Sequence, residues 1–253
     1  MTRTICISSG KGGVGKSTIT SNLAYALTEL NQDVIAIDAN LTTPHLGLQL
    51  GVHLTPRTLH DYLRGDTSLN SVIYPHPFGF KVIPASISVN DLVGADINKL
   101  QDVVLQLMGK TDIILLDSAP SLGKEATSSL QASDEVLLIT NPDLQSVLDA
   151  LKVSKVAESL NKKVLGVVIN RVRKSKHELK KYEIIDIINY PVLAVIPEDK
   201  KVHKSIALRV PLLDLDPYSP AALEIKRLAH YLIGREFTYK SYGFFDRIIR
   251  FFQ

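Results

Sequence analysis

The sequence predicts a doubly wound α/β fold, in which a mainly parallel β-sheet carries helices on both faces. Short β-branched runs alternate along the chain with longer stretches of helical periodicity. Most of those runs are continuously apolar, as expected of parallel strands that are buried on both faces. A glycine-rich segment follows the first run and leads into a helical pattern, which is a further signature of such sheets.

Seven segments are predicted to be strands because they are rich in Val, Ile and Leu and end at polar or turn-forming residues. They are 2–8, 33–38, 80–84, 112–117, 135–140, 163–170 and 191–196. Parallel strands are joined by right-handed crossovers, so we expect the segments between them to cross the faces of the sheet.

Three helices are predicted from apolar spacing and end signals. Segment 98–109 places its apolar residues at i, i+3, i+4, i+7 and i+8. Segment 219–234 has Ser219 as a candidate N-cap, then Pro220, and ends at Gly234. The helix after the glycine-rich segment is predicted to be amphipathic, with an apolar face formed by Ile19, Leu23, Ala26, Leu27 and Leu30.

Composition indicates a globular protein with an ordinary core. Apolar residues make up 45% of the 253 residues and charged residues 22%, and the net charge of +3 is too small to indicate nucleic-acid binding by itself. Cys6 is the only cysteine, which excludes an internal disulfide or a cysteine-ligated metal site within one chain, and we expect it to be a buried core thiol. We see neither a secretory signal nor an apolar run near the ~20 residues of a membrane span, so we expect a cytoplasmic protein.

The segment SSGKGGVGKST at 8–18 has P-loop spacing: Gly10, four residues, then Gly15, Lys16 and Ser17. Glycines let successive backbone N–H groups point into one concavity that binds phosphate oxygens, and the following helix directs its positive end toward the anion. This pattern predicts that Lys16 reaches the β- and γ-phosphates and that the Ser17 hydroxyl binds Mg²⁺. The predicted nucleotide contacts of the loop are Gly10, Lys11, Gly12, Gly13, Val14, Gly15, Lys16, Ser17 and Thr18.

Lys11, which follows the first glycine directly, completes the pattern KGGxGK[ST] of the deviant Walker A loop. With this pattern, residues 1 to about 234 resemble the MinD/ParA family of ATPases, and most closely its MinD branch. The resemblance implies a SIMIBI-type P-loop NTPase fold with ATP and Mg²⁺ as cofactors. It also implies an ATP-dependent homodimer in which Lys11 crosses the interface to touch the partner's ATP, where positive charge assists phosphoryl transfer.

Two further segments resemble the switches of that family. In VIAIDANLTTPHLG (34–47), Asp38 ends a buried strand near the Mg²⁺ shell, and in DIILLDSAP (112–120), Asp117 approaches the metal through water. Such an aspartate can also cap the next turn, but two of them beside a P-loop fit Mg²⁺ better. The family's first switch usually has D-x-D, whereas this chain has Asp38-Ala39-Asn40. Asn40 cannot act as a base, although it can orient water, so we expect slow hydrolysis.

The base of the nucleotide is predicted to lie near the end of segment 163–170. Asn170 resembles the family's adenine-recognising asparagine, because an amide both donates and accepts hydrogen bonds. Arg171 follows it, and the sequence NRVR lacks the NKxD pattern of GTPases, which favours ATP. Segment 196–205, with Pro197 and Glu198, resembles the loop that closes over the base.

The final stretch, FFDRIIRFFQ at 244–253, is predicted to form an amphipathic helix that lies on a membrane surface. On a helical projection, all six apolar residues fall within about 160° and the polar residues occupy the remainder. The predicted membrane contacts are Phe244, Phe245, Arg247, Ile248, Ile249, Arg250, Phe251 and Phe252. Docking onto the protein's own domain and an oligomer contact are the competing interpretations. A helix this short is marginal in water, so two copies on an ATP-bridged dimer would bind a bilayer far better than one.

We therefore predict a domain at 1–234, a flexible linker at 235–242 and a membrane-targeting helix at 243–253. The expected protein is a MinD-like ATPase, peripheral on an anionic inner membrane surface, which positions or recruits an unidentified protein partner. Four alternatives remain: a ParA-like DNA-partitioning ATPase, a non-hydrolysing ATP-dependent scaffold, an iron–sulfur carrier and a tyrosine kinase. The single cysteine argues against the carrier, and Lys11 argues against the kinase.

The ParA-like alternative depends on the basic run RVRKSKHELKK at 171–181, which has six Lys/Arg against one Glu. Such a run can hold phosphates, but a solvated helix face is the commoner explanation. It lacks interleaved aromatic residues, so we expect no nucleic-acid partner.

Overall fold

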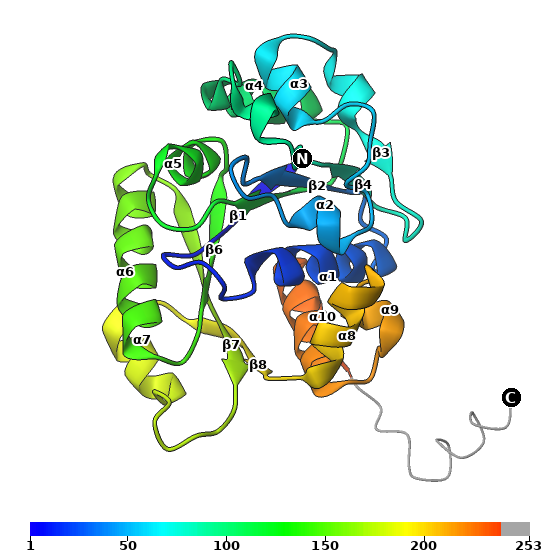
Figure 1. The fold of residues 1–253 in the computed structure, drawn as a ribbon. Helices are drawn as coiled ribbons and strands as arrows, with labels where there is room; N and C mark the ends of the chain where they lie inside the picture. Colours follow the sequence, from blue (N-terminus) through cyan, green and yellow to red (C-terminus); the bar gives the residue numbers. More distant parts are fainter. Residues whose placement is uncertain (239–253) are drawn as a thin grey trace, which may run out of the picture.

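The computed structural model describes residues 1–238 and contains one eight-stranded sheet with the order β3-β4-β2-β5-β1-β6-β7-β8 (Figure 1). Every neighbouring pair is parallel except β3 and β4, which are antiparallel. The strands are β1 (Arg3–Ser8), β2 (Val34–Ala39), β3 (Tyr74–Pro75), β4 (Lys81–Ile83), β5 (Ile113–Ser118), β6 (Glu135–Thr140), β7 (Lys163–Val172) and β8 (Val192–Pro197). The predicted fold class and all seven predicted strands are confirmed.

The sequence did not predict β3. This strand is only two residues long and includes Pro75, and so short an element leaves no periodicity to detect. It lies at the edge of the sheet, where Tyr74 pairs with Val82 and Pro75 with Lys81.

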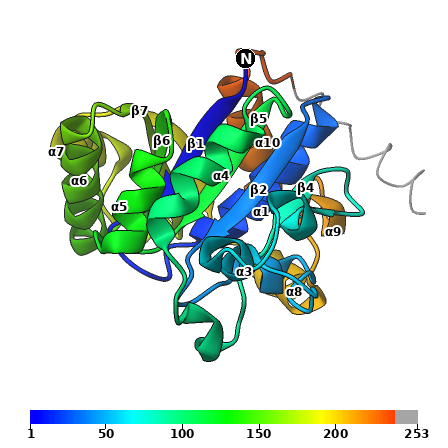
Figure 2. The same cartoon turned by 90° about the horizontal axis from the view of Figure 1, so that it is seen from above.

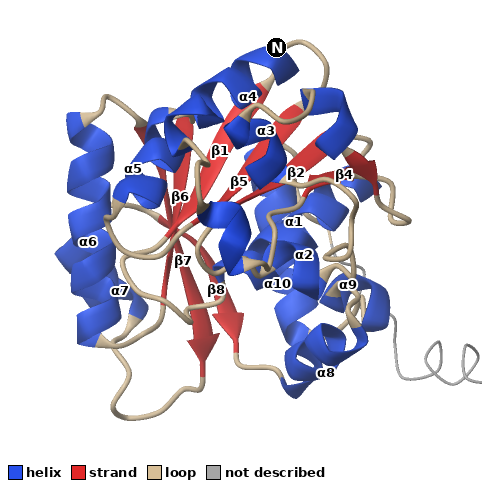
Figure 3. Ribbon diagram, turned by 45° about the horizontal axis from the view of Figure 1, so that its top comes forward, coloured by secondary structure: helices blue, strands red, loops and turns tan. Residues whose placement is uncertain are grey.

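Helices cover both faces of the sheet (Figures 2 and 3). The face formed by α1, α2, α9 and α10 is separated by the sheet from the face formed by α3 to α7. The helices are α1 (Lys16–Glu29), α2 (Leu46–Gln49), α3 (Leu59–Arg64), α4 (Leu100–Leu107), α5 (Lys124–Gln131), α6 (Leu144–Ser159), α7 (Lys181–Ile188), α8 (Lys200–Leu208), α9 (Leu212–Leu215) and α10 (Pro220–Leu232). Three 3₁₀ turns are η1 (Leu69–Val72), η2 (Val89–Leu92) and η3 (Ile97–Lys99).

The predictions for α4 and α10 are confirmed. The apolar stripe of 98–109 forms α4, whose buried residues are Leu100, Val103, Val104 and Leu107. Ser219 caps α10, because its side chain accepts a hydrogen bond from the backbone N–H of Ala222, and Pro220 is the first helical residue.

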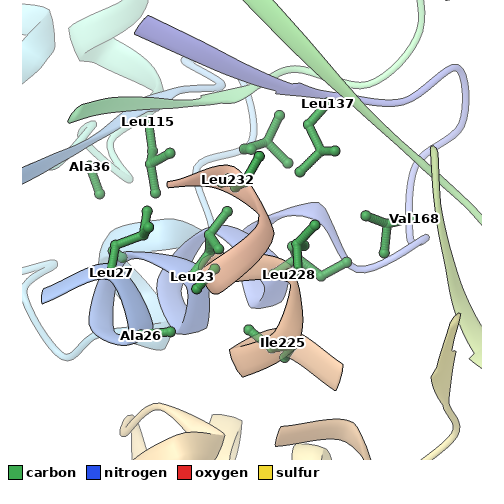
Figure 4. Close-up of a cluster of buried hydrophobic side chains, with 14 of the residues drawn as sticks. Leu23, Ala26, Leu27, Ala36, Leu115, Leu137, Val168, Ile225, Leu228 and Leu232 are labelled. Carbon is green, nitrogen blue, oxygen red and sulfur yellow. The ribbon is translucent and has the colours of Figure 1, made fainter. Parts of the chain in front are cut away.

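The predicted apolar face of α1 is confirmed, since Ile19, Leu23, Ala26 and Leu27 are buried in the core, but the helix is not amphipathic. Figure 4 shows Leu23 and Leu27 of α1 beside Leu228 and Leu232 of α10, in the core against the sheet. Polar residues on other sides of α1, including Thr20 and Asn22, are buried as well. Asn22 has both a local and a distant partner: its amide donates to the carbonyl of Thr18 at 2.8 Å and accepts from the N–H of Leu213 at 3.1 Å. Helix α1, which follows the P-loop, is therefore packed against other parts of the protein on nearly all of its sides.

Cys6 is fully buried beneath α5 and α6, which confirms the prediction of a core thiol. Burial raises its pKa to about 12, so the thiol stays protonated and unreactive at neutral pH.

The described chain continues past α10 as far as residue 238, into the predicted linker. The Phe237 ring lies 5.0 Å from the His230 ring and 5.8 Å from the Arg227 guanidinium. The predicted membrane-targeting helix at 243–253 lies outside the described residues. Within residues 1–238, no helix is both long and apolar enough to span a bilayer.

Candidate nucleotide-binding site

The predicted nucleotide contacts lie at the carboxyl edge of the central strands. The loop after β1 crosses this edge, and β1 pairs with β5 on one side and β6 on the other, which is where open α/β sheets bind ligands. A hollow of about 260 Å³ opens there. Its walls are Gly12, Gly13, Gly15, Lys16, Ser17, Thr18, Asn40, Thr43, His45, Gln49, Pro120, Arg171 and Ile206.

Two glycines hold the loop against neighbouring elements. At Gly10, a β-carbon would lie 2.3 Å from the backbone carbonyl carbon of Asp149 on α6. Gly15 has a φ of +99°, and a β-carbon there would lie 2.3 Å from the Asn170 amide nitrogen. Any other residue at Gly10 would push the phosphate-binding loop out of place, and any other residue at Gly15 would displace the Asn170 side chain and strain the backbone.

The two lysines of the loop differ in exposure, since Lys16 is buried and Lys11 is exposed. Lys16 begins α1 and is only 7% exposed, and burial lowers its pKa, although the Asp117 carboxylate opposes that shift. The first turn of α1 has no acidic residue, so the positive end of the helix is available to an anion. Lys11 is exposed at the mouth of the loop, where a second molecule could reach it.

Asp38 and Asp117 are brought side by side, as predicted, because they are register partners on β2 and β5. Burial raises the pKa of Asp38 well above its usual value, and repulsion from Asp117 raises it further. Burial also raises the pKa of Asp117, against the opposing effects of Lys16 and the Ser17 hydroxyl. Two buried, adjacent carboxylates favour either a proton or a bound cation.

The donors at this edge fit Mg²⁺. One oxygen of Asp117 accepts a hydrogen bond from the Thr20 hydroxyl at 3.3 Å, whereas the other, Oδ2, is buried without a hydrogen-bond partner. A buried orphan carboxylate oxygen near a serine hydroxyl is the ligand set that Mg²⁺ uses together with phosphates and water. Asp38 contributes differently, since its oxygens accept hydrogen bonds from the backbone of Leu46 at 2.9 Å and Asn40 at 3.3 Å.

Asn40 is engaged in a turn of its own connection. Its amide donates to the carbonyl of Thr43, and its oxygen accepts from the Thr43 N–H at 3.3 Å and hydroxyl at 3.2 Å. The neighbouring Thr42 hydroxyl donates to Glu125 of α5. Both the nitrogen and the oxygen of the Asn40 side-chain amide therefore form hydrogen bonds within the predicted first switch.

A second hollow lies beside the first and is lined by the residues predicted to hold the base: Asn170, Arg171, Pro197 and Glu198. Asn170 is buried and donates to the carbonyl of Val14 at 2.7 Å, so its amide also holds the P-loop. The prediction of a loop over 196–205 was wrong in extent. Only Glu198 and Asp199 lie outside regular structure, because Asp199 caps α8 through the N–H of Lys201.

Several residues of the site were missed by sequence analysis. Thr43, His45, Gln49, Pro120 and Ile206 line the phosphate hollow, and Gln49 accepts a hydrogen bond from the Thr18 hydroxyl at 3.2 Å. Two of them, Thr43 and His45, lie in the connection between β2 and α2, and Gln49 ends α2, so the segment after Asp38 was the available signal.

Comparisons with known proteins identify the family of the chain. The model of the CobQ/CobB/MinD/ParA nucleotide binding domain matches residues 5–213. The chain belongs to this MinD/ParA family. An ATP-binding protein of Methanocaldococcus jannaschii is 36% identical over 233 residues, 92% of this chain and 88% of that protein.

Solved structures of MinD proteins superpose closely. The septum site-determining protein MinD of Pyrococcus horikoshii, solved with Mg-ADP, has a TM-score of 0.89 and 36% identity over 92% of this chain and 96% of that chain. MinD in a MinC:MinD cell division complex of Aquifex aeolicus has a TM-score of 0.83 and 30% identity over 95% of this chain and 99% of that chain. Members of the MinD/ParA family are ATPases, and the prediction of adenine nucleotide and Mg²⁺ as cofactors is confirmed.

Proposed function

We propose that the chain is a MinD-like ATPase that dimerises on Mg-ATP and holds to an anionic membrane surface, where it positions a protein partner. The observation that carries the proposal is the exposure of Lys11 beside a buried Lys16. Lys16 contacts the nucleotide bound to its own chain, and Lys11 is placed to reach the nucleotide bound to a second copy. In this arrangement Lys11 and Lys16 both assist phosphoryl transfer.

The surroundings of the P-loop support a dimer on this face. Leu144 and Leu148 on α6 are exposed by 55% and 41%, and the Asp149 backbone of the same helix abuts Gly10. Leu122, in the connection after β5, is partly exposed too. Apolar side chains beside a charged binding loop are typical of a surface that a partner covers.

We expect Asn40→Asp to raise the rate of ATP hydrolysis by about tenfold or more, because an oriented carboxylate contributes substantial general-base catalysis. An aspartate side chain cannot donate to the Thr43 carbonyl, so it would also be released from the hydrogen-bonded turn that Asn40 forms with Thr43. Phosphate release under saturating Mg-ATP measures the rate. Asn90→Asp, at an exposed position on η2, is the matched control. An unchanged rate in Asn40→Asp would show that position 40 does not limit turnover.

The proposed membrane contact is the segment 243–253. We expect full-length protein to float with anionic vesicles in Mg-ATP but not in Mg-ADP, and a chain shortened to residue 242 to stay in solution. Ile248→Asp on the predicted apolar face should act like the deletion, whereas Gln253→Asp on the polar face should float normally. Equal flotation in both nucleotides would make the segment a constitutive anchor. Flotation of the shortened chain would assign membrane binding elsewhere.

A further inference from the structure

A cluster of positive charge lies on the connection between β7 and α7. We define the basic loop as residues 173–181, which contain Arg173, Lys174, Lys176, Lys180 and Lys181 against a single acidic residue, Glu178. All five basic residues are exposed. Sequence analysis assigned this run to a solvated helix face, but the structure places most of it outside regular structure, since β7 ends at Val172 and α7 begins at Lys181.

The acidic groups near the basic loop are largely engaged in holding its shape. The Glu178 carboxylate accepts hydrogen bonds from the backbone N–H groups of Arg173 at 2.9 Å and Ser175 at 3.2 Å. Glu183 accepts from the N–H of Lys180 at 2.7 Å. Within residues 1–238, the ion pair that joins the basic loop to another element is that of Arg173 with Glu198, at 3.6 Å. Lys174 and Lys176 therefore extend from a loop whose backbone is fixed.

The chain returns to the basic loop just before the described residues end. After α10 it turns back, so that Phe237 packs on Arg227 and His230 of that helix. Phe237 and Lys174 then line one hollow, together with Pro197, Pro220 and Leu223. The last described residues therefore lie beside the basic loop.

We propose that the basic loop is a second membrane-contacting element, which binds the anionic headgroups of lipids next to segment 243–253. The inference rests on the proposed membrane association. Each Lys or Arg held near an anionic bilayer strengthens binding about fivefold, and the effect falls off within a Debye length of about 10 Å. A basic loop that lies beside the end of the described chain can add this attraction to the proposed contact of segment 243–253. Residues 173–181 contain no Phe, Tyr or Trp for stacking on bases, which favours lipid over single-stranded nucleic acid.

The test compares full-length wild type with a Lys174→Gln/Lys176→Gln variant in Mg-ATP, using vesicles of phosphatidylcholine alone and of phosphatidylcholine with phosphatidylglycerol. The variant should bind the anionic vesicles about 25-fold more weakly and the neutral vesicles as wild type does. A Lys110→Gln/Lys155→Gln variant removes the same charge from the connection after α4 and from α6, and it should bind both like wild type.

Each contrary outcome has a separate meaning. If wild type floats and the loop variant floats equally well on anionic vesicles, the loop has no lipid contact, and the proposed function stands. If wild type floats on neither vesicle, the proposed membrane association itself fails. If the variant instead loses salt-sensitive binding to duplex DNA while its vesicle binding is unchanged, the loop is a nucleic-acid surface and the proposal is overturned.

Discussion

Gly10→Ala should weaken ATP binding by about 100-fold or more. The new β-carbon would lie 2.3 Å from the Asp149 carbonyl carbon and also 2.3 Å from its oxygen, both of them backbone atoms within α6. Helix backbone cannot swing aside as a flexible side chain would, so the loop must move. Hydrogen bonds from backbone N–H groups to a charged phosphate contribute about 1.5–3 kcal/mol each, and losing two of them accounts for the expected change.

Gly123→Ala is the matched control, since it makes the same change at a glycine outside the phosphate-binding loop. There a β-carbon would meet nothing within 4 Å, and the φ of −67° suits any residue. We expect this variant to bind ATP within a few-fold of wild type. Titration with a fluorescent ATP analogue gives both affinities, and thermal melting checks that both variants fold. Equal affinity in the two variants would mean that α6 does not position the P-loop.

The fold was predictable because its signals are local. Strands buried on both faces must be continuously apolar, and the P-loop carries its own strand, turn and helix in consecutive residues. Where the environment is set by distant parts of the chain, sequence analysis failed. Nothing local to Thr20 or Asn22 indicates that Asp117 of β5 and Leu213 of α9 would cover these polar sides of α1, and the burial is tolerated because hydrogen-bond partners are within reach.

The site was predictable only in the part that a motif encodes. The P-loop, Asp38 and Asp117 were found because each follows a recognisable strand. The contact of Asn170 with Val14 joins residues 156 apart, and no spacing in the sequence indicates it. Asn40 shows a further limit. Its identity predicted a poor base, but only the structure shows its amide engaged with Thr43.

Asp117→Asn should stabilise the magnesium-free protein and should remove the effect of Mg²⁺ on nucleotide affinity. Burial raises the pKa of Asp117 and of its neighbour Asp38, so the ionised pair is costly without a cation. The native state then binds more protons than the unfolded chain, and stability falls as pH rises through the raised pKa values. Replacing one charge by a neutral isostere should add about 1–3 kcal/mol at neutral pH, or several degrees in Tm. The amide can still accept from the Thr20 hydroxyl, as the carboxylate does at 3.3 Å.

The same change should leave nucleotide affinity insensitive to Mg²⁺. In wild type, Asp117 Oδ2 has no hydrogen-bond partner among the described residues, so bound Mg²⁺ with its water would supply one and would also relieve the repulsion from Asp38. Melting curves in EDTA at pH 5 and pH 8, and nucleotide titrations with and without Mg²⁺, separate the two effects. Asp134→Asn, an exposed position before β6, removes a charge without a buried neighbour and should change neither. A lower Tm for Asp117→Asn in EDTA would show that Asp117 stabilises the fold by its charge. That result would contradict the expected cost of the buried carboxylate pair, which requires the variant to be more stable than wild type when magnesium is absent.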